Sequence, residues 1–185
     1  YPHKALNPLP VAAHLVEVLS GTLDDGSEHF PASKLEFTSF DVGNGVSNVI
    51  PAAATLRFNV RYNDKWTPES LEASIREAIE GQDDEGTRIG FEVLGTPSRS
   101  FLSPLGGGVE VLVAAITAQT GRAPEMSTGG GTSDARFIAQ YCPVAECGLP
   151  GPTMHKADEC VPLADVRALT ALYAAFLERY FGASA

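Results

Sequence analysis

The sequence has few basic residues and no long apolar run, and each shortage excludes a class of protein. There are 13 Lys and Arg residues against 23 Asp and Glu residues, so the formal net charge is −10. An acidic chain is a poor partner for nucleic acids or anionic membranes, which carry negative charge themselves. No apolar stretch approaches the roughly 18 residues of a membrane-spanning helix, and the N-terminal residues do not resemble a signal peptide. We therefore expect a cytoplasmic protein.

Cysteine is also scarce. The three cysteines are Cys142, Cys147 and Cys160. Their odd number and the absence of a CxxC pair argue against both a disulfide framework and a cysteine zinc site. Reduced, partly buried thiols are expected instead. A serine-nucleophile triad is equally unsupported, because the sequence contains no GxSxG motif.

Hydrophobic periodicity predicts a first block of mixed helices and strands. Apolar residues at helical spacing indicate helices, and alternation of apolar and polar residues indicates strands. The expected helices are residues 7–19 and 69–80, and the expected strands are residues 34–42, 53–62 and 88–94. This order of helix, strand, strand, helix and strand lacks one leading strand of a ferredoxin-like split βαβ unit.

The second block is predicted to be α/β. Residues 95–108 are rich in Gly, Ser and Pro, which is typical of a domain connection. We place the boundary there and expect domains at residues 1–98 and 99–185. The second block is expected to contain helices at residues 109–120, 135–140 and 163–181, and a short buried strand at residues 144–147.

Residues 127–160 contain the motifs that could carry chemistry: STGGGTSDARFIAQYCPVAECGLPGPTMHKADEC. Three glycines ahead of a short helix allow close approach to a ligand and present backbone N–H groups that suit a carboxylate or an oxyanion. His155 follows a short Gly- and Pro-containing loop, and histidine is the commonest metal ligand. Each feature is weak by itself, because glycine runs usually form tight loops and a lone histidine beside acids is usually a surface residue.

The two motifs GGGTSDARFIA and MHKADECV together resemble the signature of the dinuclear-zinc aminoacylase/carboxypeptidase family. The resemblance covers essentially the whole chain, but only the C-terminal half of a full family member, in which a similar Tyr-Pro-His lies in mid-chain. It implies a fold of two parts. Residues 1–98 would be a ferredoxin-like lid that forms a homodimer, with its leading strand upstream. Residues 99–185 would be the C-terminal part of an α/β zinc-hydrolase catalytic domain.

The resemblance also implies a reaction. The motifs are most similar to the branch of the family that hydrolyses N-succinyl-LL-2,6-diaminopimelate to succinate and LL-2,6-diaminopimelate, precursors of lysine and peptidoglycan. A deacetylase of acetylornithine, a carboxypeptidase-like enzyme and a non-catalytic dimerising fragment remain alternatives. Full-length relatives bind two zinc ions per subunit, and cobalt or manganese can occupy such sites.

The resemblance assigns His155 as a metal ligand, because it matches the last ligand of the two-zinc site in relatives. The other ligands and the general base of relatives lie upstream, so the resemblance assigns no catalytic residue to this chain and implies that the chain alone is inactive. Glu159 is a candidate to orient the imidazole, although a solvated carboxylate is the simpler interpretation.

The resemblance assigns substrate-binding roles to five further residues. Asn48 would reach from the lid into the active site of the partner subunit. A guanidinium such as that of Arg61 suits a substrate with several carboxylates, because it binds them through two hydrogen bonds. The remaining matches are one contact from the lid and two from the glycine loop to a substrate carboxylate: Tyr1, Gly131 and Thr132.

Overall fold

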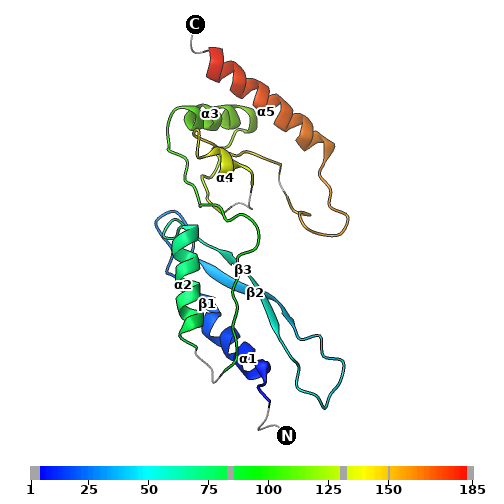
Figure 1. Cartoon of the computed structure of the whole chain (residues 1–185). Helices are drawn as coiled ribbons and strands as arrows, with labels where there is room; N and C mark the ends of the chain where they lie inside the picture. Colours follow the sequence, from blue (N-terminus) through cyan, green and yellow to red (C-terminus); the bar gives the residue numbers. More distant parts are fainter. Residues whose placement is uncertain (1–4, 83–85, 130–132, 150, 183–185) are drawn as a thin grey trace. The chain divides into compact units, whose positions relative to one another are not determined.

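The computed structural model of the chain describes residues 5–82, 86–129, 133–149 and 151–182. The chain divides into two compact units, Tyr1–Phe101 and Leu102–Ala185. In the first unit the elements are α1 (Pro8–Leu19), β1 (Gly21–Thr22), β2 (Lys34–Asp41), β3 (Thr55–Arg61) and α2 (Pro68–Glu80). In the second they are α3 (Gly108–Thr120), α4 (Ala135–Ile138) and α5 (Leu163–Gly182) (Figure 1).

Both helices of the first unit begin at capping residues, and both confirm the sequence prediction. The side chain of Asn7 accepts a hydrogen bond from the amide of Leu9 at 3.1 Å. Thr67 and Ser70 form a reciprocal capping box, in which each side chain accepts from the other residue's amide, at 3.1 and 2.9 Å. Such caps satisfy N–H groups that have no partner inside the helix.

The sheet is antiparallel, with strand order β1-β2-β3. A bulge lies at Thr38, because Phe37 pairs with Phe58 while Ser39 pairs with Arg57. An extra residue in one strand shifts the alternation of its side chains by one position. The apolar residues of β2 are spaced by two and then three, and they all pair with apolar residues of β3: Leu35 with Val60, Phe37 with Phe58 and Phe40 with Leu56.

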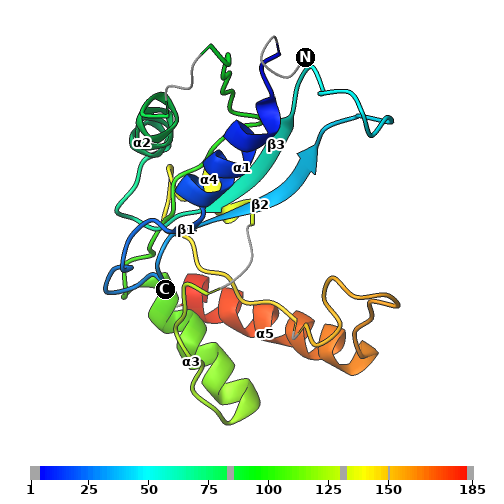
Figure 2. The same cartoon turned by 90° about the horizontal axis from the view of Figure 1, so that it is seen from below.

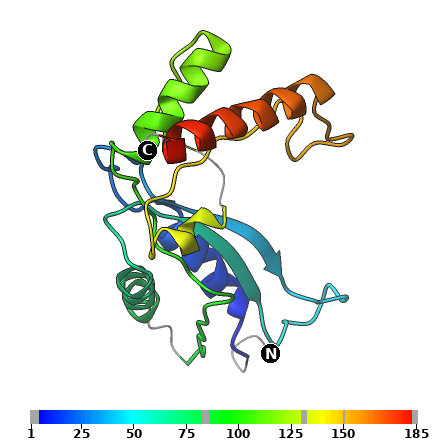
Figure 3. The ribbon, with the colours of Figure 1, turned by 90° about the horizontal axis from the view of Figure 1, so that it is seen from above.

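Helices α1 and α2 cover the same face of this sheet. The buried core joins residues from both helices and from β2: Leu19, Leu35, Leu71 and Ile75. Figures 2 and 3, seen from opposite sides, show α1 in front of the sheet in one view and behind it in the other. The first unit is therefore a small α+β domain with a three-stranded antiparallel sheet.

The predicted strand at residues 88–94 is wrong: these residues form no strand. Phe91 nevertheless packs in the core, stacked on Phe58 with ring centroids 6.2 Å apart, and the guanidinium of Arg76 lies 5.1 Å from its centroid. A strand needs a neighbour for its ladder hydrogen bonds. In the sheet of a split βαβ unit, one further strand lies between the strands that correspond to β3 and to residues 88–94. No such strand occurs in the described residues.

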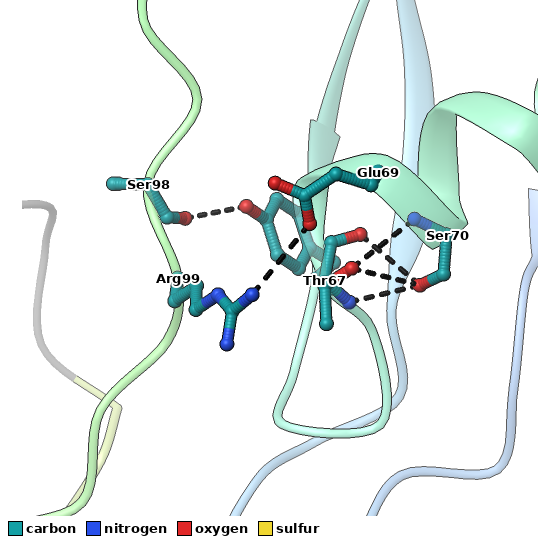
Figure 4. A network of polar contacts seen from close by, with 6 residues as sticks. Thr67, Glu69, Ser70, Ser98 and Arg99 are labelled. Atoms are coloured by element: carbon teal, nitrogen blue, oxygen red, sulfur yellow. Dashed lines mark hydrogen bonds and ion pairs between the residues drawn. The ribbon is translucent and has the colours of Figure 1, made fainter.

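The end of the first unit is attached to the start of α2 (Figure 4). The hydroxyl of Tyr62 donates to the carbonyl of Ser98 at 2.5 Å, and Arg99 forms an ion pair with Glu69 at 3.6 Å. Because Tyr62 follows β3 directly, these contacts hold residues 98–99 beside both the sheet and the helix.

The second unit is built on the packing of α3 against α5. Ala115 of α3 is completely buried and Leu172 of α5 is buried. Both helices confirm the prediction, whereas the expected strand at residues 144–147 is wrong and the helix expected at 135–140 is one turn, α4. The other apolar residues of α5 are largely exposed, including Leu177 and Phe181. No helix in the described part of the chain combines the length and apolar character needed to cross a membrane.

Candidate functional site

His155 lies in a compact loop of consecutive turns between residues 151 and 160. The amide of Met154 donates to the carbonyl of Gly151 at 3.1 Å, and the amide of Lys156 donates to the carbonyl of Thr153 at 3.0 Å. His155 has a φ of 59°, in the left-handed region. A residue with a Cβ adopts this conformation only when its surroundings hold it there.

The side chain of Thr153 closes this loop. Its hydroxyl donates to the carbonyl of Cys160 at 2.7 Å and accepts from the amide of Cys160 at 3.0 Å. The ammonium of Lys156 adds a further bond to the carbonyl of Pro152 at 2.7 Å. The loop is therefore held by polar contacts along its own backbone.

The imidazole of His155 is exposed, and no other described residue hydrogen-bonds to it. Both ring nitrogens are thus chemically able to act as metal ligands. Within residues 5–82, 86–129, 133–149 and 151–182 there is no group of three His, Cys, Asp or Glu side chains that could hold a metal ion. The exposed imidazole has the chemistry of a metal ligand, and the described residues place no cluster of further donors around it. No hydrogen bond or ion pair joins Glu159 to His155 within the described residues, and the exposed Glu159 agrees with the simpler interpretation of a solvated carboxylate.

The segment ahead of this loop is anchored to α5. The hydroxyl of Tyr173 donates to the carbonyl of Cys147 at 2.5 Å. Burial raises the pKa of Tyr173, and the neighbouring Cys147 adds to the increase. At its ordinary pKa of about 10 the phenol is already protonated at neutral pH, so it remains a donor. The bond ties the chain just before the histidine loop to a long helix.

The structure describes only part of the glycine loop. Gly131 and Thr132, like Tyr1, lie outside the described residues. Gly129 donates its amide to the hydroxyl of Ser127 at 3.0 Å, and Ser133 accepts from the amide of Ala135 at 3.1 Å. Because α4 is a single turn, the expected contribution of a helix N-terminus to anion binding is small.

Arg136 is a polar residue near the glycine loop that the sequence analysis missed. Its Nε atom is buried and has no hydrogen-bond partner among the described residues. Its guanidinium lies 4.7 Å from the ring centroid of Phe137. A buried N–H without a partner is uncommon in folded proteins. An arginine five residues after Gly131, within the motif GGGTSDARFIA, was the signal available in the sequence.

Asn48 and Arg61 lie in the first unit, at different places on the β2–β3 hairpin. Asn48 is exposed in the connection at residues 42–54, where Asn44 bonds the carbonyl of Val49 at 2.8 Å and the amide of Val46 at 3.2 Å. Arg61 is the last residue of β3, opposite Lys34. Its side chain is exposed and makes no ion pair or hydrogen bond within the described residues.

Comparison with known proteins shows which family has this sequence. Residues 1–87 match the peptidase dimerisation domain. The chain is 53% identical to succinyl-diaminopimelate desuccinylase of Rhodospirillum centenum, an alignment that covers 98% of this chain and 46% of that protein. The chain therefore belongs to the family of the succinyl-diaminopimelate desuccinylases, and the predicted resemblance is confirmed. Succinyl-diaminopimelate desuccinylase of Methylorubrum populi is 50% identical, over 98% of this chain and 47% of that protein. The enzyme of Methylobacterium sp. (strain 4-46) is 48% identical, over 100% of this chain and 47% of that protein.

The chain spans about half the length of these desuccinylases. The matched dimerisation domain includes α1, α2 and all three strands, and so contains Asn48 and Arg61. His155 lies outside it, in the second unit. The residues predicted to bind substrate from the lid and the predicted metal ligand are therefore carried by different units.

Proposed function

We propose that this chain is the C-terminal half of a metal-dependent amide hydrolase of the cytoplasm. The complete protein would add water across the amide bond of N-succinyl-LL-2,6-diaminopimelate and release succinate and LL-2,6-diaminopimelate. The observation that carries the proposal is the identity of about half of all residues, over essentially the whole chain, to desuccinylases. Both motifs that suggested the family lie within the matched region.

The first unit would be the lid and the second the C-terminal part of the catalytic domain. With one added strand between β3 and residues 88–94, the first unit would become a ferredoxin-like fold. That addition would also give residues 88–94 the ladder partner they lack. The match to a dimerisation domain supports a homodimer formed through residues 1–98.

His155 would supply one ligand to a site for two zinc ions, with cobalt or manganese as possible substitutes. When bound, two such ions polarise the amide carbonyl and lower the pKa of a bridging water. The chain's own contribution is to hold an unengaged imidazole in a loop closed by hydrogen bonds. The remaining ligands would come from the other half of the protein, so the chain alone would not turn over substrate.

Substrate carboxylates would be bound by residues of both units. Arg61 has an exposed guanidinium without a competing partner in the described residues, which suits pairing with a carboxylate through two hydrogen bonds. Asn48 would act from the hairpin connection on the active site of the partner subunit. The other proposed contacts are Tyr1, Gly131 and Thr132.

The proposal is tested by assaying the complete protein on a panel of substrates. We expect succinate release from N-succinyl-LL-2,6-diaminopimelate, loss of activity after chelation and its return with zinc or cobalt. Faster hydrolysis of N-acetylornithine, or of a peptide with a C-terminal glutamate, would instead assign the protein to another branch of amide hydrolases. If none of these substrates is hydrolysed in a metal-dependent way, the protein is a dimerising module without catalysis.

A further inference from the structure

Two residues of the loop from residue 151 to residue 160 have a left-handed backbone conformation. His155 and Asp158 are the non-glycine residues with positive φ in the described chain, at 59° and 58°. Asp and His adopt this conformation more often than other residues with a Cβ, but for them too it is uncommon and persists where the surrounding structure holds it. Both lie within five residues of Thr153.

Burial does not hold this conformation. Residues 154–160 are all exposed, and Thr153 is the only half-buried residue of the loop from 151 to 160. With so little burial, the loop depends mainly on its hydrogen bonds for order.

Thr153 takes part in most of these hydrogen bonds. Its carbonyl accepts from the amide of Lys156 at 3.0 Å, directly after His155. Its hydroxyl bonds both backbone groups of Cys160, at 2.7 and 3.0 Å. One side chain thus closes a ring of backbone around His155, and it requires both the donor and the acceptor of a hydroxyl.

We propose that Thr153 is a positioning residue that holds His155 in its left-handed conformation and so fixes where the imidazole is presented. The inference rests on the proposed role of His155 as a metal ligand. Serine retains the hydroxyl and should preserve the function, whereas valine has the same shape as threonine but can form neither bond to Cys160.

The test compares Thr153→Val and Thr153→Ser in the complete protein, with Thr170→Val as matched control. Thr170 also uses its hydroxyl in one hydrogen bond, to the carbonyl of Val166 at 2.9 Å in α5. Two measurements are made: amide hydrogen exchange of the peptide covering residues 151–160, and retention of metal during dialysis against a graded chelator.

For Thr153→Val we expect at least tenfold faster exchange in that peptide and at least tenfold weaker retention of one metal. The value of kcat should fall while KM stays within twofold. Thr153→Ser and Thr170→Val should remain within threefold of the wild type in each measurement.

Wild-type exchange in Thr153→Val would overturn the inference whatever the metal content. Equal impairment of the serine and valine variants would also overturn it, because the hydroxyl would then not be the cause. Failure of the proposed function gives a different result. If the His155→Ala protein keeps both metals, His155 is not a metal ligand. Faster exchange in Thr153→Val alone would still support the positioning of the backbone.

Discussion

Asp24 connects three separate loops of the first unit through its carboxylate. It accepts hydrogen bonds from Asn63 Nδ2 at 2.6 Å, the Gly26 amide at 2.7 Å, the Trp66 indole at 2.7 Å and the Ser33 amide at 3.3 Å. Burial by itself would raise the pKa of Asp24. The hydrogen bonds from these four residues outweigh it, and the pKa lies well below its usual range.

We predict that Asp24→Asn lowers the free energy of unfolding by about 2–3 kcal/mol at pH 7, the loss expected for hydrogen bonds to a charged group. The amide can accept at one end only, so its NH₂ group would oppose one of the four donors. Urea unfolding measures the effect. Asp25→Asn is the control, since Asp25 is exposed and makes no hydrogen bond with the described residues, and it should change stability by under about 0.5 kcal/mol.

The same carboxylate predicts how stability depends on pH. Because the folded pKa of Asp24 is lowered, its contribution is fully present above the unfolded value of about 3.9. It is lost as the pH falls from there towards the folded pKa. The stability difference between wild type and Asp24→Asn should therefore shrink steadily below about pH 4. A difference that stays constant between pH 6 and pH 3 would contradict this assignment.

Arg61 gives a prediction about substrate binding. In the complete protein, Arg61→Lys should lower kcat/KM for N-succinyl-LL-2,6-diaminopimelate more than tenfold, or about 1.4 kcal/mol. Lysine keeps the charge but loses the pair of parallel hydrogen bonds. Arg57→Lys is a matched control, because Arg57 is exposed on the same strand with no ion pair among the described residues. Equal kinetics for all three proteins would make Arg61 an ordinary surface residue.

Candidate site residues could be predicted from the sequence more readily than the hydrogen bonds that fix their conformation. His155 was predicted because it lies in a motif of contiguous residues. The hydroxyl of Thr153 and the buried Nε of Arg136 were not, since their significance depends on hydrogen bonds that close in three dimensions. The left-handed φ of His155 was equally hidden, because even the residue types enriched in that conformation, such as histidine, adopt it only in a minority of positions.

At the level of elements, helices were predicted better than strands. Helices α1, α2, α3 and α5 follow from apolar periodicity and terminal residues, which are local properties. Strands β2 and β3 were also predicted, and they pair with each other across a short connection. The segments at residues 88–94 and 144–147 have strand-like composition but no neighbouring strand in the described chain, so composition alone misassigned them.

Phe91 tests whether the segment at residues 88–94 is part of the core despite forming no strand. Phe91→Ala should lower the free energy of unfolding of the first unit by about 2 kcal/mol, below the 3–5 kcal/mol of fully buried aromatic residues because Phe91 is half-buried. Val93→Ala is the control, with Val93 43% exposed. If both variants unfold at the same urea concentration as wild type, residues 88–94 do not contribute to the core.

At the level of the whole molecule, we expect the chain to self-associate through its first unit. The outer edge of β3 pairs with no other strand in the described chain, and an open edge is a template for association. Helix α1 is the other candidate contact, with Val18 38% exposed. Sedimentation velocity over a hundredfold concentration range should show a dimer that dissociates on dilution. A monomer at every concentration would contradict the expectation.

The central claim is that this chain contributes one metal ligand, His155, to a site completed by the other half of the protein. The most direct test is the metal content of the complete protein after dialysis, compared between wild type and His155→Ala. His14→Ala is the control, since His14 is an exposed histidine of α1 that bonds Gln82 at 2.8 Å. We predict two metals per subunit in the wild type and the control, and weakened binding of one metal in His155→Ala. Two metals retained with equal affinity in all three proteins would contradict the account.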